Sequence, residues 1–288
     1  MVDEVTLTAV AYTSLLFAGL WLAYRWLLRP WFIIPFFVFG PLVLLLNIGR
    51  IHLQAFTWAK VLTLAATMLI ILGRARVKAR WQHGFSWAIV FLLALNILEA
   101  VIADSFRGNW LNAAIGLSLI ATQRGSKRIF TLPIGERSVV HYDLRWSWIL
   151  SYTVWNFTVV CAIYPKHWFD HIAILGAPLL MAALARDARR WLEIRAFILA
   201  TYAFALVLVI EVGGFAWIPS VPLPAGMIGV IKIVGVAFAV WNIVTRLRRW
   251  GDAPSGKAEV VKMTGPIVRG SAASGFAEAK PESSGRPL

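Results

Sequence analysis

Residues 86–104 read Ser-Trp-Ala-Ile-Val-Phe-Leu-Leu-Ala-Leu-Asn-Ile-Leu-Glu-Ala-Val-Ile-Ala-Asp, an apolar run interrupted by Asn96 and Glu99 before it closes on Asp104. Its length is about that of the 20 residues a helix needs to cross a hydrocarbon layer about 30 Å thick. The run therefore predicts a membrane-spanning helix, and its embedded amide and carboxylate need compensation by protein or water.

Comparable apolar stretches recur along the chain at 7–27, 31–49, 54–73, 109–123, 146–163, 169–185, 195–215 and 225–245. The composition agrees, because 59% of the residues are hydrophobic and only 15% are charged. Such a composition is far more apolar than that of a soluble domain. The sequence predicts an all-α, polytopic bundle of about nine transmembrane helices over residues 1–250.

The basic residues give the bundle an orientation. With the carboxyl terminus placed in the cytoplasm, the inner loops receive nearly all Lys and Arg, and the outer side receives only Arg50, Arg107 and Lys166. This asymmetry satisfies the positive-inside rule at every loop. We therefore expect a multi-pass protein of the inner (plasma) membrane with a cytoplasmic carboxyl terminus.

Two predicted spans are weak. The stretch 31–49 contains Pro35 and Pro41, which remove backbone donors, so it either crosses or forms a re-entrant hairpin that leaves eight spans. The stretch 109–123 is short, but without it the basic loop 124–145 would lie outside, so it is retained as a thin or tilted helix.

The net charge of +14 has a membrane explanation, since basic loops stay in the cytoplasm and meet anionic headgroups. Membrane lipids are thus the expected partners, and nucleic acid is not. The single cysteine, Cys161, lies in an apolar run and favours neither a disulfide nor a metal site. Residues 251–288 are rich in Gly, Ser, Pro and Ala and are expected to form a disordered cytoplasmic tail.

Three segments carry a resemblance to a family. They are Asn-Ile-Leu-Glu-Ala-Val-Ile-Ala-Asp (96–104), Tyr-Thr-Val-Trp-Asn-Phe (152–157) and His-Ile-Ala-Ile-Leu-Gly-Ala-Pro (171–178). Together they resemble a family of uncharacterised bacterial multi-pass inner-membrane proteins, a domain of unknown function. The resemblance implies a membrane fold but no activity, because that family has none assigned.

Ionisable and amide groups inside the predicted spans mark the candidate site. With about 1.5 Å of rise per residue, Glu99 and Lys232 lie roughly 7 and 10 Å below the outer ends of their spans. Asn96 shares a helix face with Glu99, and Asn156 pairs with Tyr152 at i, i+4. We expect an outward-opening polar cavity whose ligand-binding residues are Glu99, Lys232, Asn96, Asn156, Lys60 and Glu211. The same charges could instead form salt bridges that only fix helix registry.

The segment His167-Trp-Phe-Asp-His171 places two imidazoles at i and i+4 with Asp170 between them. This spacing can present two ligands to one metal ion. The chain has only five His, however, and lacks the His-rich boxes of membrane di-iron enzymes. We expect no metal and no other cofactor. A lysine in the last predicted span, such as Lys232, could also be compared with the retinal-binding lysine of microbial rhodopsins. Those proteins commonly carry an aspartate four residues earlier, whereas this chain has Ile228 there, which argues against retinal.

Three classes of function are compatible with this pattern. The first is a transporter or channel-like permease for a small solute or ion, with Glu99 and Lys232 as the central charges. The second is an intramembrane lipid-modifying enzyme that uses Glu99 with His167, Asp170 and His171. The third is a non-catalytic scaffold or sensor. The sequence leaves the substrate, the reaction and the oligomeric state open.

Overall fold

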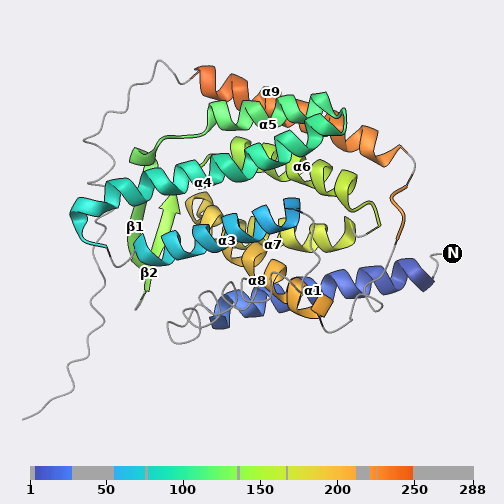
Figure 1. Ribbon diagram of the computed structural model, residues 1–288, viewed down its shortest axis with the longest axis horizontal. Helices are drawn as coiled ribbons and strands as arrows, with labels where there is room; N and C mark the ends of the chain where they lie inside the picture. The colour runs from blue at the N-terminus through green and yellow to red at the C-terminus, as the bar shows by residue number, and fades with distance from the viewer. Residues whose placement is uncertain are drawn as a thin grey trace, which may run out of the picture. The chain divides into compact units, whose positions relative to one another are not determined.

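The computed structural model describes residues 4–27, 55–74, 77–134, 137–166, 168–211, 221–224 and 226–248 (Figure 1). Its α-helices are α1 (Glu4–Leu27), α3 (Ala55–Arg74), α4 (Ala79–Phe106), α5 (Trp110–Thr122), α6 (Trp146–Ile163), α7 (Trp168–Leu184), α8 (Trp191–Glu211) and α9 (Met227–Arg248). Two short 3-10 helices, η1 (Ser126–Arg128) and η2 (Ala188–Arg190), and two strands complete it. The protein is therefore mostly helical, as the sequence predicted.

Eight of the nine predicted stretches coincide with these helices, and the weak stretch 109–123 is the helix α5. The Pro-containing stretch 31–49 and the predicted tail 251–288 lie outside the described residues. In the described part of the chain, four helices are long and apolar enough to cross a membrane: Leu7–Arg25, Arg80–Phe106, Trp146–Ile163 and Met227–Arg248. The nine predicted crossings are thus not confirmed.

The all-α prediction is wrong in one place, because the loop 124–145 contains a β-hairpin. Strand β1 (Ile129–Ile134) pairs antiparallel with β2 (Arg137–Tyr142), with Ile129 opposite Tyr142 and Ile134 opposite Arg137. Gly135 and Glu136 separate the two strands in sequence. The strands themselves are rich in β-branched residues, which are Ile129, Thr131, Ile134, Val139 and Val140. A two-residue gap containing glycine between such runs is a hairpin signal. The sequence analysis had treated the segment as a loop because it is rich in positive charge.

The helices pack in two connected groups. Helix α6 packs against α9 and α5, and α4 packs against α5 and α3 (Figure 1). Helix α7 packs against α1 and α8, while α3 contacts α8 and α6 contacts α7. Unit Met1–Arg248 contains all of these contacts, and the second unit, Arg249–Leu288, lies outside the described residues. The contacts therefore join every described helix into one bundle.

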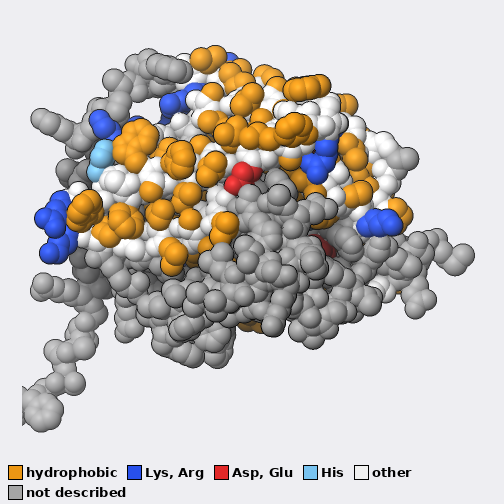
Figure 2. Space-filling view, viewed as in Figure 1, with side chains coloured by type: hydrophobic (Ala, Val, Ile, Leu, Met, Phe, Trp, Pro, Cys, Tyr) orange, Lys and Arg blue, Asp and Glu red, His pale blue; other side chains and the backbone are white. Residues whose placement is uncertain are grey.

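The surface of the bundle is apolar. Figure 2 shows a face on which hydrophobic side chains dominate the described residues and charged groups are few. Phe91 is 64% exposed and Ile233 is 71% exposed, and many other large apolar side chains share this exposure. Soluble monomers rarely expose continuous apolar surface on this scale. The helices thus offer a surface suited to lipid.

One end of the bundle collects the basic residues. The Arg190 guanidinium donates to the hydroxyl of Tyr24 near the end of α1, at 3.5 Å. Gly73 near the end of α3 lies against Phe85 near the start of α4. Asn242 of α9 donates to Thr122 at the end of α5, at 2.8 Å. The ends of α1, α3, α5 and α9 therefore lie at the same end as the starts of α4 and α8, which we call the basic end.

Candidate functional site

The hydroxyl of Tyr152 joins two of the amides that the sequence singled out. Asn96 of α4 donates to it from Nδ2 at 3.2 Å, and Asn156 of α6 donates from Nδ2 at 3.1 Å. Tyr152 is only 2% exposed. The structure therefore brings Asn96 and Asn156 together on one buried oxygen, inside an otherwise apolar core.

Aromatic neighbours hold Tyr152 in place. Its ring stacks on Trp148 with centroids 5.3 Å apart, and the indole of Trp191 meets it edge-on, also at 5.3 Å. Trp155 lies tilted against it at 5.8 Å. The indole nitrogens of Trp148 and Trp155 donate to the carbonyls of Leu119 and Asn112 in α5. This packing leaves the phenol little freedom to move away from its donors.

A buried arginine lies beside the same tyrosine. Arg195, in the second turn of α8, is close enough to Tyr152 to interact with it electrostatically, and it donates from Nη1 to the carbonyl of Ile174 at 3.4 Å. It is 5% exposed, and among the described residues its Nε has no acceptor. The sequence analysis placed Arg195 with the cytoplasmic loops, whereas the structure places it inside the bundle. We refer to Asn96, Tyr152, Asn156 and Arg195 as the central polar cluster.

Glu99 lies one helical turn from Asn96 on α4 and faces α3. The hydroxyl of Thr63 donates to Glu99 Oε1 at 2.5 Å. A hydrogen bond to a carboxylate is stronger than one between neutral groups and stabilises the charge. Polar groups on α4 thus contact α3 on one side and α6 on the other.

Three further charges were predicted to belong to the site: Lys232, Lys60 and Glu211. Lys232 is half-buried in α9, and no hydrogen bond or ion pair between described side chains connects it with Glu99. Lys60 lies in α3 and Glu211 ends α8, but their side chains are outside the described set. The convergence of the four charges therefore stays a prediction.

Two members of the central polar cluster lie in the halves of their helices that begin at the basic end. At about 1.5 Å per residue, Arg195 is roughly 6 Å and Tyr152 roughly 9 Å along α8 and α6 from their first residues. Both helices begin at the basic end. By the same rise, Asn96 and Glu99 lie roughly 26 and 30 Å along α4 from its first residue, in the half of that helix nearer the opposite end, toward which the sequence analysis expected the polar groups to gather. The missed signal was Arg195 itself, which is the first residue of the predicted run 195–215.

The histidine segment is engaged with aromatic side chains. Tyr202 donates to Asp170 Oδ2 at 3.0 Å. The ring of His171 stacks on Tyr164 at 5.9 Å and meets Tyr202 edge-on at 6.4 Å. His167 is outside the described residues, and the described part of the chain contains no group of three His, Cys, Asp or Glu suited to a metal ion. The arrangement of Asp170 and His171 favours packing between α7 and α8.

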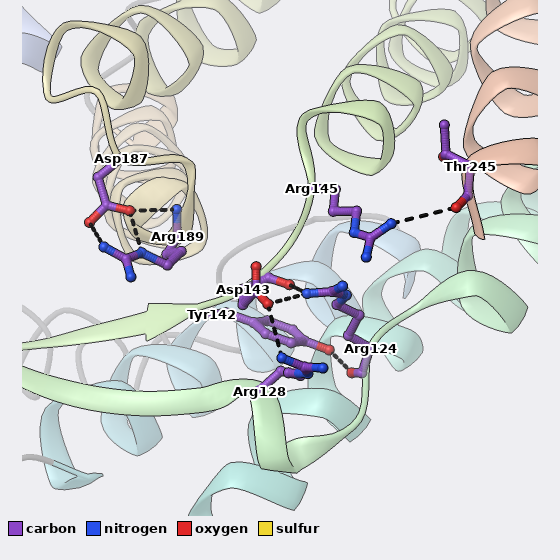
Figure 3. A network of polar contacts seen from close by, with 8 residues as sticks. All are labelled: Arg124, Arg128, Tyr142, Asp143, Arg145, Asp187, Arg189 and Thr245. Carbon is purple, nitrogen blue, oxygen red and sulfur yellow. Dashed lines mark hydrogen bonds and ion pairs between the residues drawn. The ribbon is translucent and has the colours of Figure 1, made fainter. Parts of the chain in front are cut away.

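The basic end carries a second polar network, built around the hairpin (Figure 3). Asp143 pairs with Arg124 and lies 3.7 Å from Arg128, while the Tyr142 hydroxyl donates to the carbonyl of Arg124. Arg145 donates to the Thr245 carbonyl at 3.5 Å. Burial raises the pKa of Tyr142 and lowers that of Arg124. These contacts tie the strand end to α5, α6 and α9.

The hairpin is also fastened to α8. The backbone N–H of Val140 donates to Glu193 Oε2 at 2.5 Å, in the first turn of that helix. His141 Nε2 lies 3.3 Å from Asp187 Oδ2, and its ring stacks on Phe130. Arg189 pairs with Asp187 at 2.7 Å. Strand β2 therefore places a backbone N–H against the carboxylate of Glu193, in the first turn of α8, and an imidazole against that of Asp187, which comes shortly before this helix.

The fold and these polar sites define a mostly helical protein whose apolar helices suit a membrane and whose core contains a small hydrogen-bonded cluster. The chain belongs to DUF5692, a family of unknown function, whose model matches residues 105–252, just over half of its length. Two of the three segments that carry the predicted resemblance, 152–157 and 171–178, lie within that range. No curated protein and no solved structure matches the chain.

Proposed function

We propose that the chain is a multi-pass protein of the inner membrane with nine crossings and a cytoplasmic carboxyl terminus. The basic end supports this orientation, because Lys and Arg collect on the cytoplasmic side of membrane proteins. The end of α1 lies at the basic end, and the start of α3 lies at the opposite end, as the contacts of Tyr24 and Gly73 indicate. A crossing between these two helices is consistent with that geometry and with the predicted span 31–49.

Within that protein we propose a site that binds and transports a small solute or ion. The proposed ligand-binding residues from the sequence are Glu99, Lys232, Asn96, Asn156, Lys60 and Glu211, to which the geometry adds Tyr152 and Arg195. The observation that supports transport most strongly is the central polar cluster, in which amides from α4 and α6 donate to one buried hydroxyl and a buried guanidinium from α8 lies beside it. Such groups inside a membrane helix bundle are costly and commonly mark substrate pathways.

The chemistry of the cluster favours a solute that accepts hydrogen bonds. Two amides donate to the phenolic oxygen of Tyr152 and match its two lone pairs. Arg195 beside it has five N–H groups, of which Nη1 donates to the Ile174 carbonyl and Nε has no acceptor among the described residues, and its guanidinium adds a permanent positive charge. A small anion or an oxygen-rich solute would complete this set of donors. On the other side of α4, Glu99 supplies the negative group that a coupled cation or proton needs.

Uptake into proteoliposomes tests this function. The full chain is reconstituted and assayed with a panel of radiolabelled inorganic anions, carboxylates, amino acids and sugars. Tyr152→Phe removes the shared acceptor but keeps the ring, so it should lower uptake by about tenfold or more, since unsatisfied buried donors cost about 1–3 kcal/mol. Asn96→Ala should act in the same direction.

Tyr164→Phe is the matched control, because it makes the same chemical change at a side chain that is 39% exposed and outside the cluster. It should keep wild-type uptake. Two results would contradict transport: no solute enters above empty liposomes, or Tyr152→Phe transports as well as the wild type. The first of these would favour the scaffold function, in which the cluster only holds α4, α6 and α8 together.

A further inference from the structure

A hollow opens at the basic end, away from the central polar cluster. Its volume is about 480 Å³, and its lining comes from the first turns of α4, the last turn of α9, η1 and the two residues before η1. Ligand pockets in proteins commonly have volumes of about 300–1,000 Å³. The lining includes Arg124, Lys127, Arg128 and Arg246 with Trp87 and Ser126, and we call it the basic pocket.

Four cations line the basic pocket. Asp143 contacts two of them, Arg124 and Arg128 (Figure 3). Burial lowers the pKa of Arg124, and the nearby charges of Arg128 and Arg246 lower it further, against the opposing effect of Asp143. Like charges this close repel one another. A bound anion would relieve that repulsion.

The chemistry around the pocket favours a phosphate group. Guanidinium groups bind phosphate oxygens through paired, charge-assisted hydrogen bonds, and a lysine adds a flexible point charge. Arg124, Arg128 and Arg246 provide the guanidinium groups and Lys127 the ammonium group. Lys127 is exposed, so it can reach toward a ligand that enters the pocket.

The position of the pocket favours a lipid over a free ion. Trp87 lines it and is 52% exposed, with Trp81 similarly exposed on the preceding turns of α4. Indoles on membrane proteins prefer the headgroup level. Trp87 donates to His83 Nε2 at 3.1 Å, so the indole is oriented beside the opening. One turn further along α4, Phe91 begins the apolar surface along which acyl chains would lie.

We propose that the basic pocket binds the phosphate of an anionic lipid headgroup. The headgroup occupies the hollow between η1 and the ends of α5 and α9, and its acyl chains follow the exposed face of α4. This inference does not rest on the proposed transport function, because none of the pocket residues belongs to the central polar cluster. Loss of either activity therefore leaves the other testable.

Lipid binding is measured on the purified full chain in a neutral maltoside detergent, with bound lipid counted by native mass spectrometry. The probes are phosphatidylglycerol, zwitterionic phosphatidylcholine and inorganic phosphate. The wild type should retain phosphatidylglycerol in preference to phosphatidylcholine. Lys127→Gln with Arg128→Gln should weaken phosphatidylglycerol binding by about 30-fold, since each cation near a headgroup contributes about 1 kcal/mol.

Lys78→Gln with Arg80→Gln is the matched control. It removes two cations from the start of α4, at the same end of the bundle, which do not line the pocket. It should change affinity by no more than about twofold, because screened charges outside a pocket contribute little. Lys127→Gln alone, at an exposed side chain, keeps the test valid if the double variant does not fold.

Three outcomes would overturn the proposal. One is an equal loss of phosphatidylglycerol in the pocket pair and the control pair, which would indicate general charge attraction. Another is equal retention of phosphatidylglycerol and phosphatidylcholine by the wild type. The third is inorganic phosphate that displaces the lipid at equal concentration, which would assign the pocket to a free ion.

Discussion

Gly116 in α5 lies in close contact with side chains of α4 and α6, and a methyl group there should destabilise the fold. A Cβ added to it would lie 2.8 Å from Cζ2 of Trp155 and would also collide with Val101. Trp155 has no room to retreat, because it is 1% exposed and its indole N–H donates to the Asn112 carbonyl at 2.8 Å. Close approach at small residues is a common basis of helix packing in membranes.

The magnitude follows from two opposing effects. Alanine improves helix propensity over glycine by about 1 kcal/mol. Overpacking of a tight core costs about 1–3 kcal/mol, and a partner held by a hydrogen bond moves the cost toward the upper part of that range. We therefore expect Gly116→Ala to lower the free energy of unfolding by about 1 kcal/mol, and Gly116→Val to lower it by more.

Thermal unfolding in detergent, followed by tryptophan fluorescence, measures the effect. The control is Gly176→Ala in α7, where an added Cβ would meet nothing within 4 Å. Gly176→Ala should gain the propensity benefit, so the two variants should differ by about 4–8 °C in Tm, at about 2–4 °C for each kcal/mol. A Gly116→Ala protein that melts at or above the wild-type temperature would refute the packing argument.

Two further predictions concern the basic end. Glu193→Ala removes the acceptor for the Val140 N–H, and a buried unpaired donor costs about 1–3 kcal/mol, so limited proteolysis between the strands at Gly135 and Glu136 should accelerate. Unchanged cleavage would show that the hairpin does not depend on α8. Burial lowers the pKa of His141 in the folded protein. As the pH falls, this imidazole is therefore protonated in the unfolded chain at a higher pH than in the folded protein. Stability should therefore fall between about pH 7 and pH 5, and Tm measured across that range should vary less in His141→Gln; an equal slope in the variant would contradict this.

The helices were predictable because their signal is local. A run such as 86–104 must bury its backbone polar groups in a helix if it lies in hydrocarbon, whatever its neighbours are. The same reasoning located α5, although it is only 13 residues long. It failed at the hairpin, where strand-forming residues between positive charges were taken for a loop.

The candidate site was predictable only in part. Asn96 and Asn156 were singled out as polar residues in apolar runs, and the structure brings them to the same hydroxyl. Tyr152 was noticed only as the neighbour of Asn156. Arg195 was assigned to a loop, because charge at the start of a helix is ambiguous between the interface and the interior. Its place against Tyr152 depends on how α8 packs beside α6.

By itself, the sequence determined the mostly helical architecture, the positions of the described helices and the gathering of positive charge in the segments that join them. These follow from residue polarity and chain length, which act within a single segment. Only the tertiary structure decided which helices touch, that three of them meet at Tyr152, and that Arg246 of α9 joins the three cations of residues 124–128 around one hollow. Such contacts join residues far apart in the chain, and packing between helices sets their distances.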